Sequence, residues 1–170
     1  MEKISFMNQI VRGLLFALLI SCAPRTGRAI EWRTDLPAAA ADARQEQKLL
    51  LLNFSGSDWC GWCQRLDAEV FSTDAFRAYA AANLVAVLAD FPRRTKLAAE
   101  LQARNERLKR HFQVQGFPTV LLFSSGGELI AQLGYQPGGP EAFVAAIQQA
   151  RSRYPLRRPD LPPGPMLPLE

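Results

Sequence analysis

The order of hydrophobic and polar positions along the chain predicts a domain that mixes helices and strands. Residues 49–54, Leu-Leu-Leu-Leu-Asn-Phe, form an almost continuous apolar run, which is typical of a strand buried on both faces. A second apolar run at 84–89 predicts another strand. Two further runs, 119–123 and 128–133, flank a Ser-Ser-Gly-Gly segment whose glycines allow a tight connection, so they predict an antiparallel hairpin.

Helical patterns separate these strands. Asp35 is a good N-cap, and the Ala-rich stretch that follows it predicts a first helix over 36–48. The next helix is predicted over 60–70, with a second segment over 73–82 after a break at 71–72, and two more helices are predicted over 95–112 and 141–151. The resulting element order is α, β, α, β, α, β, β, α, which places the chain in the α/β class.

The charge distribution argues against nucleic-acid binding. The 170 residues carry a formal net charge of +4. Residues 30–150, however, contain 12 Lys and Arg against 13 Asp and Glu, a net charge of −1, so the basic excess lies at the two ends. A nucleic-acid-binding domain would carry its basic stripe on the folded part.

The N-terminal segment has the pattern of an export signal. Lys3 and Arg12 precede an apolar run at 13–20 that is too short for a dedicated membrane-spanning helix. Two forms of processing fit the sequence. Cleavage after Ala29 would remove a signal peptide of residues 1–29. A lipobox-like Leu-Ile-Ser-Cys would instead end a lipoprotein signal at residue 21 and make Cys22 a lipid anchor.

Both forms predict an exported protein, periplasmic or otherwise extracytoplasmic, and a folded domain over 30–154. Six prolines lie within 155–170, which predicts a disordered tail there because proline removes backbone donors and favours extended conformations.

The candidate chemistry is concentrated in Trp59-Cys60-Gly61-Trp62-Cys63. Two cysteines three residues apart on the first helical turn are close enough to form a disulfide. The helix start favours a thiolate, so we predict Cys60 as the nucleophile and Cys63 as the resolving thiol. A purely structural disulfide would constrain only a short loop, and a zinc site would lack ligands beyond these cysteines and His111. Trp59 and Trp62 are candidate substrate-binding residues, Trp62 in particular.

These residues resemble the thioredoxin superfamily. The likeness rests on Trp-Cys-Gly-Trp-Cys after a buried strand and on Gly116-Phe117-Pro118-Thr119 before the hairpin, and it covers about residues 31–151. The stretch from Asn53 to Cys60 is most similar to secreted bacterial thioredoxin-like proteins of the thioredoxin-7 type. The resemblance implies a thioredoxin-like fold, with a central mixed sheet and helices on both faces. It also implies a cis bond before Pro118 and substrate binding by Phe117 and Pro118.

The sequence departs from thioredoxin at one buried pair of charges. Asn53 stands where thioredoxin has a buried Asp, and the partner Lys is missing from 84–89. Because an unpaired buried ion is costly, the joint loss is physically coherent. The proton acceptor for Cys63 is therefore left open. Asp58, Asp67 and Glu69 lie nearby in sequence, but we interpret them as solvated surface residues.

The sequence thus predicts a thiol–disulfide oxidoreductase that acts on exported proteins, in the reductase or isomerase direction. Its expected partners are protein disulfide or dithiol substrates and a redox donor that the sequence does not identify. We expect no small-molecule cofactor and no metal. The alternative is a thioredoxin-like module that binds a client or assembly partner without turnover, and the two intact cysteines argue against it.

Overall fold

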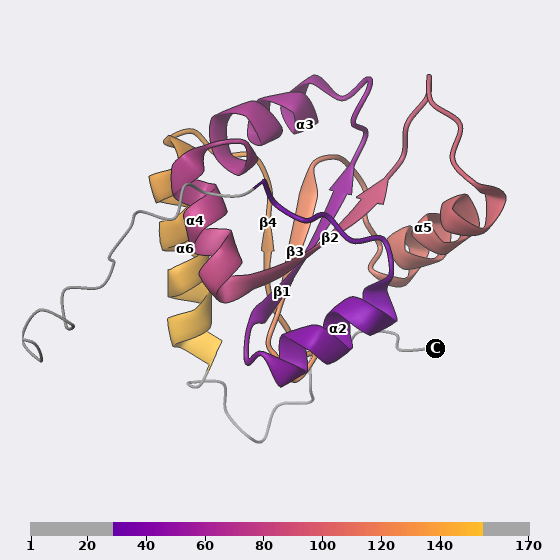
Figure 1. Ribbon diagram of the computed structural model, residues 1–170. Coiled ribbons are helices and arrows are strands. Elements are labelled where there is room, and N and C mark those ends of the chain that lie inside the picture. The colour runs from indigo at the N-terminus through magenta and orange to yellow at the C-terminus, as the bar shows by residue number, and fades with distance from the viewer. Residues whose placement is uncertain (1–28, 155–170) are drawn as a thin grey trace, which may run out of the picture.

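A computed structural model describes residues 29–154 and shows one four-stranded sheet between two layers of helices (Figure 1). The expectations for a signal segment and a proline-rich tail lie outside the described residues. The strands are β1 (Leu49–Ser55), β2 (Leu84–Asp90), β3 (Thr119–Phe123) and β4 (Leu129–Leu133). The helical elements are α2 (Leu36–Gln45), α3 (Gly61–Leu66), the π-helical turn η1 (Asp67–Phe71), α4 (Asp74–Asn83), α5 (Ala99–His111) and α6 (Gly139–Arg153).

Strand β1 is central in the sheet, whose order is β2-β1-β3-β4. It pairs in parallel with β2 and antiparallel with β3, and β4 closes the hairpin against β3. All seven residues of β1 are buried, as its almost continuous apolar run predicts. The predicted mixed sheet is confirmed.

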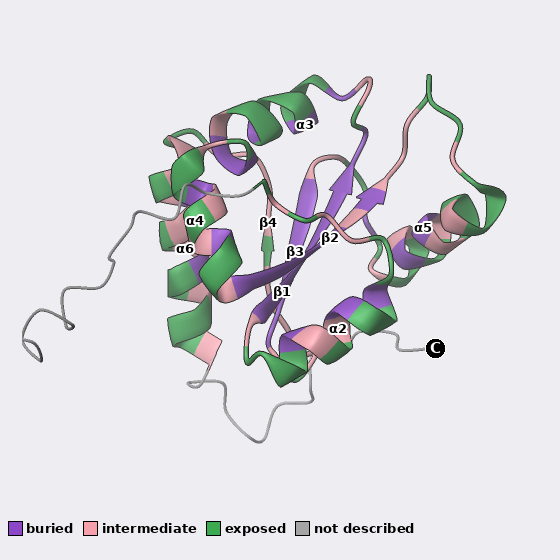
Figure 2. Cartoon of the chain, viewed as in Figure 1, coloured by how far each residue is buried: buried purple, intermediate pink, exposed green. Residues whose placement is uncertain are grey.

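The two faces of β1 serve two cores, because successive side chains of a strand point to opposite sides of the sheet. Leu50, Leu52 and Phe54 pack with residues of α2 and α5. Leu49 and Leu51 pack instead with the layer formed by α3, η1, α4 and α6. Figure 2 shows β1, β2 and β3 as the buried centre of the molecule, with β4 and the outer faces of the helices more exposed.

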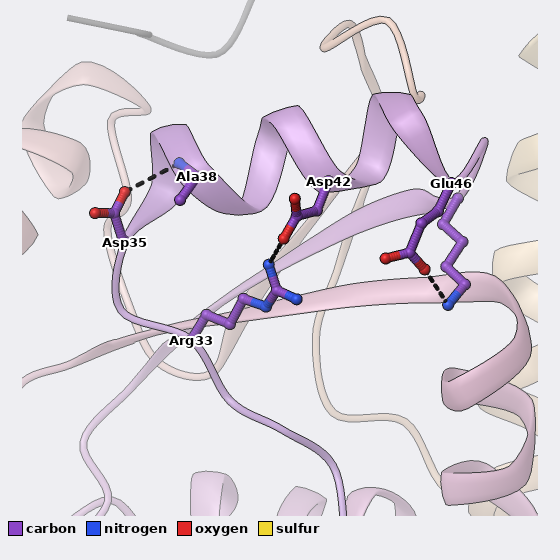
Figure 3. A network of polar contacts seen from close by, with 6 residues as sticks. Arg33, Asp35, Ala38, Asp42 and Glu46 are labelled. Carbon is purple, nitrogen blue, oxygen red and sulfur yellow. Dashed lines mark hydrogen bonds and ion pairs between the residues drawn. The ribbon is translucent and has the colours of Figure 1, made fainter.

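Polar contacts fix α2 at the start of the domain (Figure 3). Asp35 caps the helix by accepting a hydrogen bond of 3.0 Å from the Ala38 amide, as the sequence predicts. Arg33 forms an ion pair with Asp42 on the next turns of the helix. The backbone of Arg33 also bridges to β2 at Val87, so this network ties α2 to the edge strand.

Two helices end earlier than their sequence patterns predict, and both end in the same way. Helix α2 stops at Gln45 rather than Lys48, because Gln47 adopts a left-handed conformation with φ of 55°. The Lys48 amide then bonds back to the Ala43 carbonyl, which completes a Schellman motif. Helix α5 repeats this geometry with Gln113, at φ of 53°. Glycine usually occupies this position, so its absence hid both ends.

The helix that carries the cysteines also differs from its prediction. It begins at Gly61 as expected, but it widens into η1 after Leu66 instead of continuing as an α-helix to Val70. The Ser72 amide donates to the Asp67 carbonyl five residues back, which is the spacing of a π turn. Across residues 29–154, no helix combines the length and apolar character needed to cross a membrane.

Candidate active site

Cys60 and Cys63 form a disulfide at the start of α3, at the end of the sheet where β1 terminates. Their Cα atoms are 5.2 Å apart, within the range that a disulfide requires. Cys60 is the N-cap of the helix, and Cys63 lies on its first turn facing the core. Gly61 and Trp62 between them form the outer side of this turn and are exposed.

The two sulfur atoms differ in their hydrogen bonding rather than in their burial. The exposed fractions of Cys60 and Cys63 are 7% and 5%, so both cysteines are buried to nearly the same extent. The Cys63 amide, however, donates a hydrogen bond of 3.2 Å to Sγ of Cys60. An amide donor at a helix N-terminus stabilises negative charge on the sulfur that it faces. The local geometry therefore favours a thiolate at Cys60.

Trp59 is held firmly beside this disulfide. Its Nε1 donates a hydrogen bond of 2.7 Å to the Phe91 carbonyl, at the end of β2. Gly56 lies directly under the indole, and a Cβ there would stand 2.5 Å from Cε2 of Trp59. Trp59 is therefore a partly buried residue beside the disulfide, and the hydrogen bond of its indole N–H fixes its orientation.

Asp58 organises the loop between β2 and α5, which leaves the same end of the sheet as the loop before α3 (Figure 1). Its carboxylate accepts hydrogen bonds of 2.9, 2.7 and 3.1 Å from the amides of Arg93, Arg94 and Thr95. These bonds lower the pKa of Asp58, and the bond from the Arg93 amide has the largest effect. They also explain why α5 begins at Ala99 and not near Thr95. Asp58 is partly exposed at the surface, in line with the sequence interpretation, but the sequence did not reveal that it holds this loop.

The Phe117–Pro118 peptide bond is cis, as the family resemblance implies. The Phe117 ring packs on Trp59, with ring centroids 6.0 Å apart, and stacks on Phe91 at 5.0 Å. Nζ of Lys109 lies 5.5 and 5.6 Å from the centroids of Phe91 and Phe117. The sequence-predicted Trp59 and Phe117 are thus brought together next to a cation that the sequence analysis did not single out.

Trp62 lies on another side of the cysteine pair and is 56% exposed, the one large hydrophobic side chain so exposed in the part of the chain described. Its ring centroid lies 5.1 Å from that of Tyr135, which comes from the segment between β4 and α6. Arg65 lies over both rings and forms an ion pair of 2.6 Å with Glu69. Because Trp62 and Tyr135 are 73 positions apart, no local sequence signal could pair them.

Glu69 links Arg65 and Tyr135, the two neighbours of Trp62, by hydrogen bonds. It accepts a hydrogen bond of 2.8 Å from the hydroxyl of Tyr135 as well as the one from Arg65. The bond from Arg65, followed by that from Tyr135, lowers the pKa of Glu69. The same contact with Glu69 raises the pKa of Tyr135. Glu69 is therefore a structural anion of the surface beside Trp62.

Asn53 is buried in the centre of the sheet with an exposed fraction of 6%. Asn53 is two residues from Leu51, so both side chains point to the face of β1 that α3 covers. The Oδ1 atom of Asn53 has no hydrogen-bond partner. A neutral amide thus occupies a place where a charge would lack a partner. Between Ala29 and Tyr154, no three His, Cys, Asp or Glu side chains gather in a way that could hold a metal ion.

Comparisons with known proteins agree with this architecture. The family model for the thioredoxin-like domain matches residues 36–151. The disulfide bond reductase DsbH of Chlamydia pneumoniae is 30% identical over 127 residues, which cover 75% of this chain and 76% of that protein. A solved structure of a DsbH oxidoreductase superposes with a TM-score of 0.72 at 29% identity, and the match covers 79% of this chain and 92% of that one. A thioredoxin from Thermus thermophilus shares the fold, with a TM-score of 0.54, 20% identity, and coverage of 74% and 90%.

Proposed function

Since the chain belongs to the thioredoxin superfamily and is a thiol–disulfide oxidoreductase, we propose that it reduces disulfide bonds of exported proteins. The observation that carries this proposal is the Cys60–Cys63 disulfide at the start of α3, with the Cys63 amide directed at the Cys60 sulfur. That arrangement lowers the cost of a thiolate at the cysteine that has to attack.

The reaction follows from the two sulfur atoms. In the dithiol form, the Cys60 thiolate attacks one sulfur of a client disulfide, and the other client sulfur leaves as a thiolate that takes up a proton. Cys63 then loses its proton and attacks Cys60 in the mixed disulfide. The client is released as a dithiol, and the Cys60–Cys63 disulfide reforms. Two electrons have passed to the client, and a dithiol donor protein must supply two more to reduce the Cys60–Cys63 disulfide again.

The proposed roles of the surrounding residues follow from their positions. Trp62 offers an exposed ring for an unfolded or extended client segment, and Trp59 and Phe117 form an aromatic wall on the other side. The backbone at Phe117 and Pro118 would pair with that segment as an added strand. The three carboxylates near Cys63 in sequence have other partners, since Asp58 is engaged by the loop amides, Asp67 by the Ser72 hydroxyl and Glu69 by Arg65. We therefore assign the proton of Cys63 to solvent or to the client thiolate.

The reductive direction is supported by two observations. Gly61-Trp62 between the cysteines contains neither a cation nor a histidine, so the thiolate is stabilised mainly by the helix start. We expect a reduction potential nearer about −270 mV than about −120 mV, the values typical of thioredoxin and of a strong oxidase. The relative from Chlamydia pneumoniae is named a disulfide bond reductase, which agrees with this direction.

An insulin-reduction assay with dithiothreitol tests the proposed function. The wild-type protein should accelerate insulin precipitation, and Cys60→Ser should abolish the acceleration. A Cys63→Ala variant should accumulate a mixed disulfide with client proteins through Cys60. Wild-type activity no greater than that of Cys60→Ser would instead favour the binding-module alternative.

We also propose that the protein is exported, either as a soluble form or as a lipoprotein acylated at Cys22. The basis for this proposal is the sequence pattern of residues 1–29, which lie mostly outside the described structure. Mass spectrometry of the mature N-terminus distinguishes the two forms, because lipidation begins the chain at Cys22 and cleavage after Ala29 begins it at Ile30. An intact Met1 on cytoplasmic protein would contradict both.

A further inference from the structure

A cleft of about 520 Å³ lies between the Trp59–Phe117 wall and the loop that joins β2 to α5. The net charge of its lining is positive. Its cations are Arg93, Arg94, Lys96 and Lys109, and its acidic side chains are Asp90 and Glu106. Asp90 is already engaged, because its carboxylate accepts hydrogen bonds of 2.9 and 2.6 Å from the amide and hydroxyl of Ser57.

Within residues 29–154, the four cations of this cleft are not held in ion pairs, although the charge of Arg94 acts on the nearby Asp58 carboxylate. Two are placed against aromatic rings, with the Arg93 guanidinium 3.7 Å from the Trp59 centroid and Lys109 over Phe91 and Phe117. Arg94 and Lys96 are exposed on the loop. A clustering of unpaired positive charge raises the local concentration of negatively charged groups.

The loop that presents these cations is fixed to the active-site turn, residues 56–61, which join β1 to α3. Asp58 holds the amides of Arg93, Arg94 and Thr95 and precedes Cys60 by only two residues. The carboxylate is occupied by backbone donors, and the side chains of Arg94 and Lys96 are exposed to solvent. Any chain that brings its disulfide to Cys60 therefore passes close to this positive loop.

We propose that the cleft is a docking site for an acidic polypeptide segment that flanks the disulfide of a client. This inference rests on the proposed function, since it names the class of client that the same site prefers. Carboxylates of the segment would pair with Arg94 and Lys96, while its apolar groups would lie on the wall formed by Trp59 and Phe117. Such charge complementarity acts on partner choice and on the association rate, and salt weakens it.

Binding of redox-inert peptides tests the proposal independently of turnover. Peptides in which Ser replaces the client cysteines, with either Asp and Glu or Asn and Gln on the flanks, are titrated into the wild-type protein by calorimetry. The acidic peptide should bind about fivefold more tightly at low salt, as two exposed ion pairs allow, and high salt should remove the difference. Equal affinity for the two peptides at low salt would overturn the proposal.

A matched pair of double variants locates the effect. Arg94→Gln with Lys96→Gln should bring the two affinities together. Arg107→Gln with Arg151→Gln removes the same charge at exposed positions outside the cleft and should preserve the preference. A preference that both variants lose equally would reflect net charge alone and would contradict a docking site.

Insulin reduction by the wild-type protein separates this proposal from the proposed function. Reduction without a preference for acidic peptides overturns only the docking site. A preference that Arg94→Gln with Lys96→Gln abolishes, without any reduction of insulin, supports the docking site and overturns only the proposed function.

Discussion

Single residues at the centre of the sheet and beneath the active-site turn show how closely the site is constrained. Asn53 is buried with an unpartnered Oδ1, and Gly56 supports the Trp59 indole so closely that no Cβ fits. Neither role follows from the residue type alone. Each depends on a neighbour that packing brings into place, and each can be tested by a conservative substitution.

Asn53→Asp should make stability depend on pH. Burial raises the pKa of a carboxyl group above its unfolded value of about 3.9, so the variant should match the wild type at acid pH. As the pH rises above that value, it should lose about 1–3 kcal/mol of unfolding free energy, because the buried charge has no partner. Denaturant melts across this range measure the effect. Asn53→Leu should show no such pH dependence, and a flat profile for Asn53→Asp would contradict the argument.

Two glycines of the active-site turn should respond in opposite ways to alanine. Gly56→Ala places a Cβ 2.5 Å from Trp59, so the indole has to move and its bond to Phe91 is strained. The cost should be about 1–3 kcal/mol of unfolding free energy. At Gly61 no atom lies within 4 Å of the new Cβ, and alanine should stabilise the helix by up to about 1 kcal/mol. Equal effects in chemical denaturation would exclude this explanation.

At the scale of elements, helix interiors are predictable from the sequence and helix ends are less so. Helices α2, α5 and α6 could be located from their apolar spacing, because a buried stripe repeats over several turns. The ends depend on single contacts. Gln47 and Gln113 take a conformation that favours glycine, and Asp58 satisfies loop amides from 35 to 37 positions away. Neither feature can be recognised from the hydrophobic and polar pattern of the neighbouring residues.

Gln47→Gly should stabilise the end of α2. At φ of 55° a side chain strains the backbone, and glycine removes that strain, so the unfolding free energy should rise by about 0.5–1 kcal/mol. The same exchange at Gln45, the last residue of the helix with right-handed helical geometry, should lower it by up to the same amount. Thermal and urea melts of both variants give the comparison. Destabilisation by Gln47→Gly would show that the Schellman motif does not control this end.

Asp58→Ala should loosen the loop between β2 and α5 in a pH-dependent way. The pKa of Asp58 is lowered in the folded protein, so its stabilising effect is complete above the unfolded value and is lost as the pH falls through the folded value. The melting temperature of the variant should therefore be lower than that of the wild type near neutral pH, and the difference should shrink in strong acid. Asp58→Asn keeps one acceptor oxygen without the charge and should fall between the two. A difference that persists unchanged in acid would contradict this role.

At the scale of the whole molecule, the sequence predicted the fold and the two cysteines but not the composition of the surfaces around them. The buried strand, the Cys-Gly-Trp-Cys motif and the segment at Pro118 are each local in sequence, so each can be identified without coordinates. The cluster of Trp62, Tyr135 and Arg65 and the basic cleft join segments that the sheet topology alone brings together. Long-range contacts of this kind have no local periodicity to reveal them.

The central place of β1 has a consequence for biosynthesis. The ribosome makes Leu49–Ser55 before either of its neighbours, yet Leu49 pairs with Leu84 and Leu50 with Phe123. Until β3 has emerged, one edge of a mostly apolar strand stays open, and such an edge invites pairing with other chains. Chains released after Gly116 should therefore aggregate or be held by chaperones, whereas chains released after Leu133 contain all four strands of the sheet. Pulse proteolysis of both released chains would measure the protection that β3 and β4 provide.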